Sequence, residues 1–220
     1  MGTPLRIDFV SDVSCPWCVI GLKALEQALD NLGELVDAEI HFQPFELNPK
    51  MPPEGQDLDE HLLQKYGATP EQFADTRQAI RDRGEELGFI FRMDRRARIY
   101  NTFDCHRLLH WAAGEGRQLD LKLALFRAYF TEGQNPGASE VLLQAVADVG
   151  LDVARAREIL GTREFEEEVR AQQRFYQQAG ISAVPAVVVN ERYLLQGGQP
   201  VETFETALRQ IARESVAEEE

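Results

Sequence analysis

The sequence predicts an α/β protein whose strands lie near the two ends of the chain and whose middle is a large all-α insertion. Short runs of alternating apolar residues or of β-branched residues occur before residue 46 and after residue 183, and such runs indicate strands. Between residues 56 and 179, apolar residues recur every three or four positions, which is the period of amphipathic helices. The expected order is therefore β-α-β, a helical block and β-β-α.

The N-terminal part is expected to form the β-α-β unit. Leu5–Val10 is an apolar run that predicts a strand, and Val19–Leu32 predicts the helix that follows it. Ala38–Phe45 has apolar residues at alternating positions and predicts a second strand. Three prolines within residues 49–53 mark the exit from this unit.

Residues 56–179 are expected to be helical throughout, with recognisable start signals. Thr69-Pro70-Glu71-Gln72 is a capping box with proline at the first helical position. Asn101-Thr102 is expected to cap a helix, and Ser139-Glu140 to start a later one. The remaining predicted helices include Leu119–Phe130 and Glu164–Ala179.

The C-terminal part is expected to be a hairpin followed by a helix. Val184–Val189 is a β-branched run, Asn190-Glu191-Arg192 predicts a turn, and Tyr193–Gln196 predicts the returning strand. Gly197-Gly198-Gln199-Pro200 ends that strand. An amphipathic helix is expected to follow.

Composition indicates an ordinary soluble globular protein. Apolar residues make up 44% of the 220 residues and charged residues 27%. The net charge of −14, from 23 basic and 37 acidic residues, argues against a nucleic acid as partner. The acidic stretch Glu214–Glu220 is expected to be a solvated, disordered tail.

The sequence predicts a cytoplasmic location. Three cysteines are too few for a disulfide-stapled secreted scaffold. The first residues lack the basic and apolar regions of a signal peptide. No window approaches the eighteen uninterrupted apolar residues of a membrane-spanning helix, so we expect no membrane association.

Two cysteines separated by two residues follow the first predicted strand, as Cys15-Pro16-Trp17-Cys18. The predicted helix Val19–Leu32 comes next, which places Cys15 at a helix N-terminus. Unpaired backbone N–H groups and the helix dipole favour a negative charge there. Such a setting lowers a thiol pKa from about 8.5 to about 3.5–7.5. The pattern predicts a reversible dithiol–disulfide switch with an activated first sulfur.

A zinc site is one alternative for this cysteine pair. His106 and His110, four residues apart on a predicted helix, are the other candidate ligands. About ninety residues separate the two pairs, whereas zinc-finger patterns use short spacings, so we expect no bound metal. A purely structural disulfide is another alternative, but a cross-link that closes so short a loop restrains little of the unfolded chain.

Several motifs, in order along the chain, are similar to those of one known family. They are Asp8–Cys18, Phe42–Pro49, Asn101-Thr102 with His106–Leu108, Leu125–Phe130, Val184-Pro185 and Gly197–Pro200. With them the chain resembles the DsbA-type thiol–disulfide oxidoreductases, in particular their cytoplasmic FrnE-like branch. The resemblance implies a thioredoxin-like fold formed by residues 1–50 and 161–220, with residues 51–160 as an inserted helical domain.

The resemblance also implies roles for individual residues. Cys15 would be the attacking cysteine and Cys18 the resolving one. Val184-Pro185 would be the loop whose cis proline faces the active site, where the backbone of Val184 can pair with an extended peptide. Trp17 is expected to tune the dithiol and contact substrate. The implied substrate-binding residues are Pro16, Trp17, Val184 and Pro185.

Other residues are expected to be structural. Cys105 and Trp111 are predicted to pack in the core. His41 and His61 are expected to be surface or packed histidines rather than catalytic bases. FrnE-like relatives can carry a second cysteine pair near the C-terminus, and since this chain has no cysteine after Cys105, functions of that pair are not carried over.

The sequence thus predicts disulfide exchange with a disulfide-containing protein or with glutathione. We expect this reaction to need no cofactor, with glutathione as a possible co-substrate. The same fold serves kappa-class glutathione transferases and hydroxychromene-carboxylate isomerases, but those relatives typically have serine at the position of Cys15 and lack Cys18. A zinc-binding or chaperone-like protein is the remaining alternative. The sequence specifies no oligomeric state.

Overall fold

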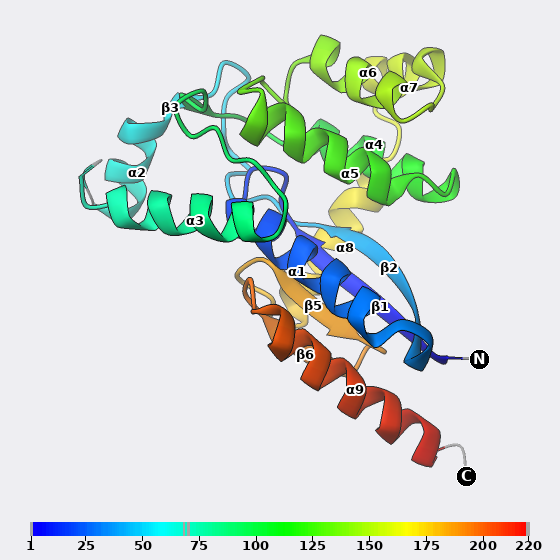
Figure 1. Cartoon of the computed structure of the whole chain (residues 1–220). Coiled ribbons are helices and arrows are strands. Elements are labelled where there is room, and N and C mark those ends of the chain that lie inside the picture. The colour runs from blue at the N-terminus through cyan, green and yellow to red at the C-terminus, as the bar shows by residue number, and fades with distance from the viewer. Residues whose placement is uncertain (1, 68, 70, 219–220) are drawn as a thin grey trace.

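A four-stranded mixed sheet forms the centre of the molecule. Its strands are β1 (Thr3–Ser11), β2 (Val36–Pro44), β5 (Ala186–Val189) and β6 (Tyr193–Gln196), in the order β2-β1-β5-β6. β1 pairs in parallel with β2 and antiparallel with β5, and β5 pairs antiparallel with β6. This computed structural model describes residues 2–67, 69 and 71–218 (Figure 1).

Helices cover both faces of this sheet. Parallel strands require a crossover connection, which α1 (Pro16–Leu32) supplies between β1 and β2. α9 (Val201–Glu218) lies beside α1 (Figure 1), and both pack on the face that carries Phe9. On the opposite face Val10 packs against Tyr176, which lies on α8 (Glu166–Gln178).

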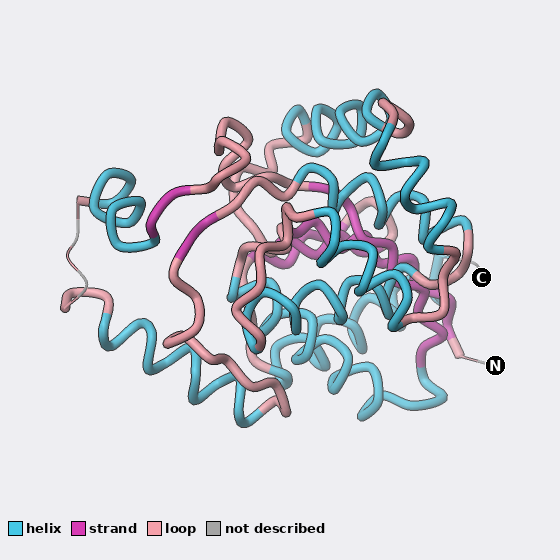
Figure 2. The backbone as a smooth tube through the Cα atoms, turned by 90° about the horizontal axis from the view of Figure 1, so that it is seen from above, coloured by secondary structure: helices cyan, strands magenta, loops and turns pink. Residues whose placement is uncertain are grey.

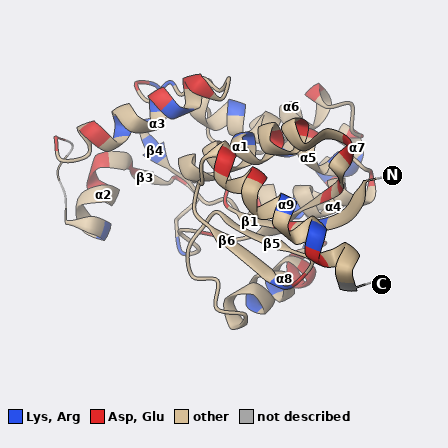
Figure 3. Cartoon of the chain, turned by 60° about the horizontal axis from the view of Figure 1, so that its bottom comes forward, with Lys and Arg blue, Asp and Glu red and all other residues tan. Residues whose placement is uncertain are grey.

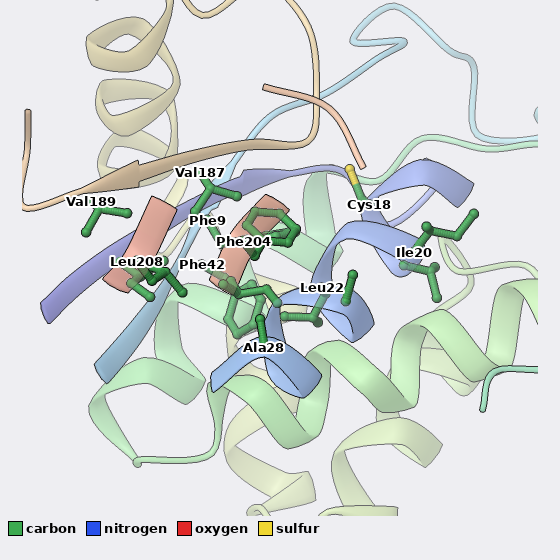
Figure 4. Packing of buried hydrophobic residues seen from close by; sticks show 14 of the residues in the cluster. Phe9, Cys18, Ile20, Leu22, Ala28, Phe42, Val187, Val189, Phe204 and Leu208 are labelled. Carbon is green, nitrogen blue, oxygen red and sulfur yellow. The ribbon is translucent and has the colours of Figure 1, made fainter. Parts of the chain in front are cut away.

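One apolar cluster joins the sheet to α1 and α9. Phe9 and Phe42 contact each other edge to face, with ring centroids 5.7 Å apart, because the parallel register places these residues side by side. Phe204 of α9 is fully buried against them, and so is Cys18 of α1 (Figure 4). Burial of a large apolar side chain contributes about 1.5–3 kcal/mol, so this cluster holds α1 firmly on the sheet.

The helical block lies between β2 and β5. Four of its helices enclose a second core that includes Leu108, Leu121, Leu142 and Ile159. α5 ends in a single π-helical turn at Arg127–Thr131. The helices are α2 (Leu58–Tyr66), α3 (Ala74–Glu86), α4 (Phe103–Gly114), α5 (Gln118–Phe126), α6 (Ser139–Asp148), α7 (Val153–Gly161) and α8.

The expectation that this block is helical throughout is wrong in more than one place. β3 (Gln56–Asp57) and β4 (Arg98–Ile99) pair antiparallel and form a separate two-stranded sheet, which lies apart from the main strands in Figure 2. Two-residue strands are too short to show an alternating pattern. No helix is assigned between Glu86 and Phe103.

The C-terminal helix is longer than expected. α9 extends to Glu218, so the predicted disordered tail does not begin at Glu214. The Glu214 carboxylate accepts a hydrogen bond of 2.6 Å from the Tyr193 hydroxyl, which ties this turn of the helix to β6. Residues 219–220 of the predicted tail lie outside the described residues.

The predicted capping box at residues 69–72 is only partly described. The Thr69 backbone N–H donates to Gln72 Oε1 at 2.7 Å, as one half of a capping box does. α3 nevertheless begins at Ala74, after a turn. Pro70 lies outside the described residues.

Acidic and basic side chains are distributed over the surface helices. Figure 3 shows both kinds along α3, which is consistent with a solvated face. Within the part of the chain that the structure describes, no helix has the length and apolar character needed to cross a membrane. The predicted class, an α/β fold with a large helical insertion, is confirmed.

Candidate active site

The turn from β1 into α1 places Cys15 directly before the first residue of the helix. Cys15 is the N-cap residue, with extended dihedral angles of φ −94° and ψ 113°, and Pro16 is the first helical residue. Proline suits this position because its missing N–H would have no helical partner there. The turn is closed by backbone hydrogen bonds from Cys15 N to Asp12 O (3.2 Å) and from Cys18 N to Cys15 O (3.1 Å).

The two cysteines of this turn differ in exposure. Cys15 retains 4% of its surface and Cys18 none, and both are free thiols. Burial, reinforced by a hydrogen bond with Cys15, raises the pKa of the Cys18 thiol well above its ordinary value. Cys18 is therefore protonated at neutral pH, and Cys15 is the sulfur that an incoming disulfide meets first.

The loop before β5 lies against Cys15. Because Val10 of β1 is paired with Ala186, the residues just before Ala186 come next to the end of β1. The Cys15 thiol contacts the carbonyl oxygen of Val184 at 3.7 Å. The Val184–Pro185 peptide bond is cis. This loop and the cysteine turn thus form one site.

Gly21 makes room for the proline of this loop. A Cβ atom at Gly21 would lie 3.0 Å from Pro185 Cγ, which is tighter than most contacts of this kind, so the proline ring would have to shift. The pattern of apolar residues in α1 does not reveal this requirement, because it depends on a loop more than 160 residues away in the chain.

Asp12, a buried residue directly after β1, holds the cysteine turn in place through hydrogen bonds. Its side chain is 1% exposed and accepts hydrogen bonds from the backbone N–H groups of Ser14 (3.1 Å) and Leu47 (2.7 Å). His106 Nε2 lies 3.8 Å from Asp12 Oδ1. Burial alone would raise the pKa of Asp12, but His106 and the two N–H groups outweigh it and lower that pKa. Asp12 is therefore a carboxylate at neutral pH.

A cleft of about 670 Å³ opens beside Cys15. Pro16, Trp17 and Val184 line it, as the resemblance implied for substrate contacts, whereas Pro185 does not. The far wall is apolar and comes from the helical block, through Leu58, Leu62, Tyr66, Phe73 and Ile80. The sequence alone does not mark these wall residues as part of a site, because their spacing only indicates helices.

Basic side chains border the same cleft. Lys65, Arg77 and Arg96 line it, in a protein whose net charge is −14. Arg96 Nη2 donates to the carbonyl oxygen of Ser14 at 3.3 Å, which holds its positive charge next to the cysteine turn. His61 also lines the cleft, but burial lowers its pKa, so it is neutral at pH 7. Glu46 also lines the cleft, where Arg170 pairs with its carboxylate.

The candidate zinc ligands are not gathered into a metal site. His106 contacts Asp12, while the ring of His110 packs against Phe165 with centroids 5.1 Å apart. Among the described residues, no group of three or more His, Cys, Asp or Glu side chains could hold a metal ion. That the protein works without metal stays a prediction.

The third cysteine lies in the helical core. Cys105 is fully buried, and its thiol donates to the carbonyl oxygen of Pro136 at 3.1 Å. Burial raises the pKa of Cys105 far above its ordinary value. Trp111 belongs to the same cluster and is 7% exposed.

We expect iodoacetamide to modify Cys15 of the folded, reduced protein before the other two thiols. Cys18 and Cys105 are fully buried and burial raises the pKa of both, so their reactive thiolate form is scarce near pH 7. Peptide mapping after timed alkylation between pH 6 and 9 measures this. Equal rates for Cys15 and Cys105 in the folded protein would contradict the assignment.

Comparison with known proteins agrees with this geometry. The DSBA-like thioredoxin domain family matches residues 6–209. The uncharacterized protein YwbO of Bacillus subtilis (strain 168) is 27% identical over 205 residues, which are 93% of this chain and 96% of YwbO. The crystal structure of a probable DsbA oxidoreductase, SCO1869 from Streptomyces coelicolor, is 32% identical with a TM-score of 0.88, covering 94% of this chain and 89% of that chain.

A more distant structure shares the fold. The cytosolic disulfide reductase DsbM from Pseudomonas aeruginosa, solved with GSH, is 19% identical with a TM-score of 0.63, covering 94% of this chain and 99% of that chain. Because the family match spans nearly the whole sequence, the chain belongs to the DSBA-like thioredoxin domain family and is a thiol–disulfide oxidoreductase.

Proposed function

We propose that the protein exchanges disulfides through Cys15 and Cys18 with a substrate that enters the cleft beside Cys15. The observation that carries the proposal is the asymmetric burial of the two thiols. Cys15 borders the cleft, whereas Cys18 lies fully buried behind it. This arrangement lets substrate reach only the first sulfur and leaves the second to complete the reaction.

The reaction follows from these positions. The Cys15 thiolate attacks one sulfur of a substrate disulfide, and the other substrate sulfur leaves as a thiolate that takes up a proton. Cys18 then loses its proton and attacks Cys15 Sγ. The bond between Cys15 and the substrate breaks, which releases a second thiol and leaves a Cys15–Cys18 disulfide. The reverse sequence oxidises a dithiol substrate.

The cleft supports glutathione or an extended acidic peptide as the substrate. Its volume of about 670 Å³ is in the range of small-molecule sites. Lys65 and Arg96 can attract carboxylates, and the carbonyl oxygen of Val184 can accept a peptide N–H. The GSH in the DsbM structure supports the same class of ligand. A cytoplasmic enzyme of the FrnE-like branch would meet such substrates.

The experiment that tests the proposal follows the fate of oxidised glutathione. One equivalent added to the reduced protein should give two equivalents of reduced glutathione and one Cys15–Cys18 disulfide. Cys105 should still be alkylated after denaturation. Liquid chromatography and intact mass spectrometry measure all three species.

A second assay on the same preparation addresses glutathione transfer, the competing chemistry on this fold. Fold alone does not distinguish the two reactions. The protein is mixed with reduced glutathione and a small electrophile. Rapid conjugate formation, together with no oxidation of Cys15 in the first assay, would contradict the proposal.

A further inference from the structure

Arg96 has a fixed position at the border of the cleft. Its guanidinium carbon lies 4.9 Å from the ring centroid of Tyr129 and 5.1 Å from that of Phe130. Its Nη2 donates to the carbonyl oxygen of Ser14 at 3.3 Å. A guanidinium group held by two aromatic rings and a backbone carbonyl loses little freedom when a ligand binds to it. Arg96 is therefore organised for binding before a ligand arrives.

The π-helical turn after α5 sets this position. Tyr129 and Phe130 are consecutive residues of that turn, and both are buried. The Tyr129 hydroxyl donates to the carbonyl oxygen of Arg98 at 2.9 Å, which ties the segment that carries Arg96 to the turn. Single π-helical turns within α-helices are frequent at functional sites. The motif Leu125–Phe130 thus helps to place a guanidinium group next to the cysteine turn.

Arg96 differs from the other charged side chains that line the cleft, since each of those has a charged or polar side chain as its partner. These pairs are Lys65 with Asn48, Arg77 with Asp59, and Glu46 with Arg170. Arg96 contacts no carboxylate among the described residues. Its Nε is buried and has no hydrogen-bond partner within the described part of the chain. The protein itself therefore leaves part of the binding capacity of this cation unused.

We propose that Arg96 binds a carboxylate of the substrate and so selects disulfides that carry a carboxylate close to the reacting sulfur. The inference deepens the proposed disulfide exchange and rests on it. Arg96 is hydrogen-bonded to Ser14, and Cys15 is the next residue and lines the same cleft. A carboxylate bound to Arg96 therefore holds a sulfur a few bonds away beside Cys15. Guanidinium suits this ligand because it can pair with both carboxylate oxygens at once.

The protein as a whole does not attract anions. Its net charge is −14, which repels an anionic substrate at long range. Salt screens such repulsion beyond about 8 Å under physiological conditions, whereas contacts inside the cleft are screened much less. A preference for carboxylate-bearing disulfides must therefore come from a cation within the cleft. This makes substrate charge a direct test of the role of Arg96.

Three small disulfides with the same two-carbon arm test the wild-type protein. Dithiodipropionate carries carboxylates, hydroxyethyl disulfide is neutral, and cystamine carries ammonium groups. Each is mixed with reduced protein and quenched with acid, and the mixed disulfide and the Cys15–Cys18 disulfide are measured by mass. Each rate constant is divided by that of dithiothreitol with the same disulfide, which removes intrinsic reactivity. We expect the corrected rate with dithiodipropionate to be at least about fivefold higher than with the other two.

The same series separates failure of the inference from failure of the function. Equal corrected rates for the three disulfides, or a higher rate with cystamine, would overturn the role of Arg96 while disulfide exchange stands. If the protein reacts with none of the three and not with oxidised glutathione, the proposed function fails first.

The second test removes the charge. Arg96→Met retains much of the apolar contact with the two rings, and we expect at least about tenfold slower reaction with dithiodipropionate but less than about threefold change with hydroxyethyl disulfide. Arg96→Lys keeps a positive charge without the planar fork, so it should recover part of the loss. Arg95→Met makes the same charge change at an exposed position that does not line the cleft, and should keep the wild-type preference.

These variants distinguish substrate binding from a structural role. Equal losses with the charged and the neutral disulfide would mean that Arg96 only supports the cysteine turn, and would overturn the proposal. A folded Arg96→Met protein that keeps the wild-type preference would overturn it as well. If this variant does not fold, the wild-type series with the three disulfides decides.

Discussion

Replacing Cys15 with serine is expected to lower the rate of disulfide exchange by at least about 1000-fold. A hydroxyl is a far weaker nucleophile than a thiolate at neutral pH, and it cannot form a mixed disulfide. Cys18 cannot take over the first step, because it is fully buried and burial raises its pKa. The reaction with oxidised glutathione, followed by release of the reduced form, measures the loss.

Cys105→Ser is the matched control for this variant. The new hydroxyl keeps a donor for the carbonyl oxygen of Pro136, which accepts from Cys105 at 3.1 Å, and the position lies in the helical core. The control should exchange disulfides at close to the wild-type rate. A Cys15→Ser protein that keeps more than a tenth of the wild-type rate would show that another group starts the reaction.

Replacing Cys18 with serine is expected to trap the reaction at its midpoint. Cys15 still attacks, but no second thiol of the protein displaces the substrate, so the mixed disulfide should rise from a minor species to nearly one per chain. Dithiothreitol should release the bound thiol. Intact mass spectrometry of protein treated with oxidised glutathione, or with a peptide disulfide, measures the adduct.

The same variant distinguishes disulfide exchange from glutathione transfer. A transferase uses the thiol of glutathione and forms no bond to the enzyme, so Cys18→Ser would leave it unaffected. Full turnover of a small electrophile with no trapped adduct would therefore refute disulfide exchange. The serine differs from Cys18 by one atom, so the fully buried position should accept it with little change in packing.

The helical insertion adds to the chemistry of the cysteine turn in two separate ways. Its first helices, α2 and α3, provide the apolar wall and basic rim of the cleft. A later helix, α4, places His106 3.8 Å from Asp12, which anchors the turn. The insertion thus lines the cleft beside Cys15 and, through His106, also reaches Asp12 in the turn.

Local patterns in the sequence were sufficient for much of the fold. The expected strand at residues 5–10 is β1, and the expected helix at residues 19–32 is α1, which starts three residues earlier at Pro16. The reason is that strand and helix periods, and the preference of proline for the first helical turn, are properties of neighbouring residues. The same reasoning placed Cys15 at the start of a helix.

Contacts between residues far apart in the sequence were decided by the tertiary structure. Val184 contacts Cys15 across 169 positions because the β1–β5 register brings them together. The sequence shows Lys122 only as one polar residue in a predicted helix, and its burial depends on how α5 packs on β2. Such contacts follow from sheet register and side-chain packing, which no local period encodes. The sequence by itself therefore determined that a pair of cysteines stands at the start of a helix, whereas packing decided which residues surround that pair.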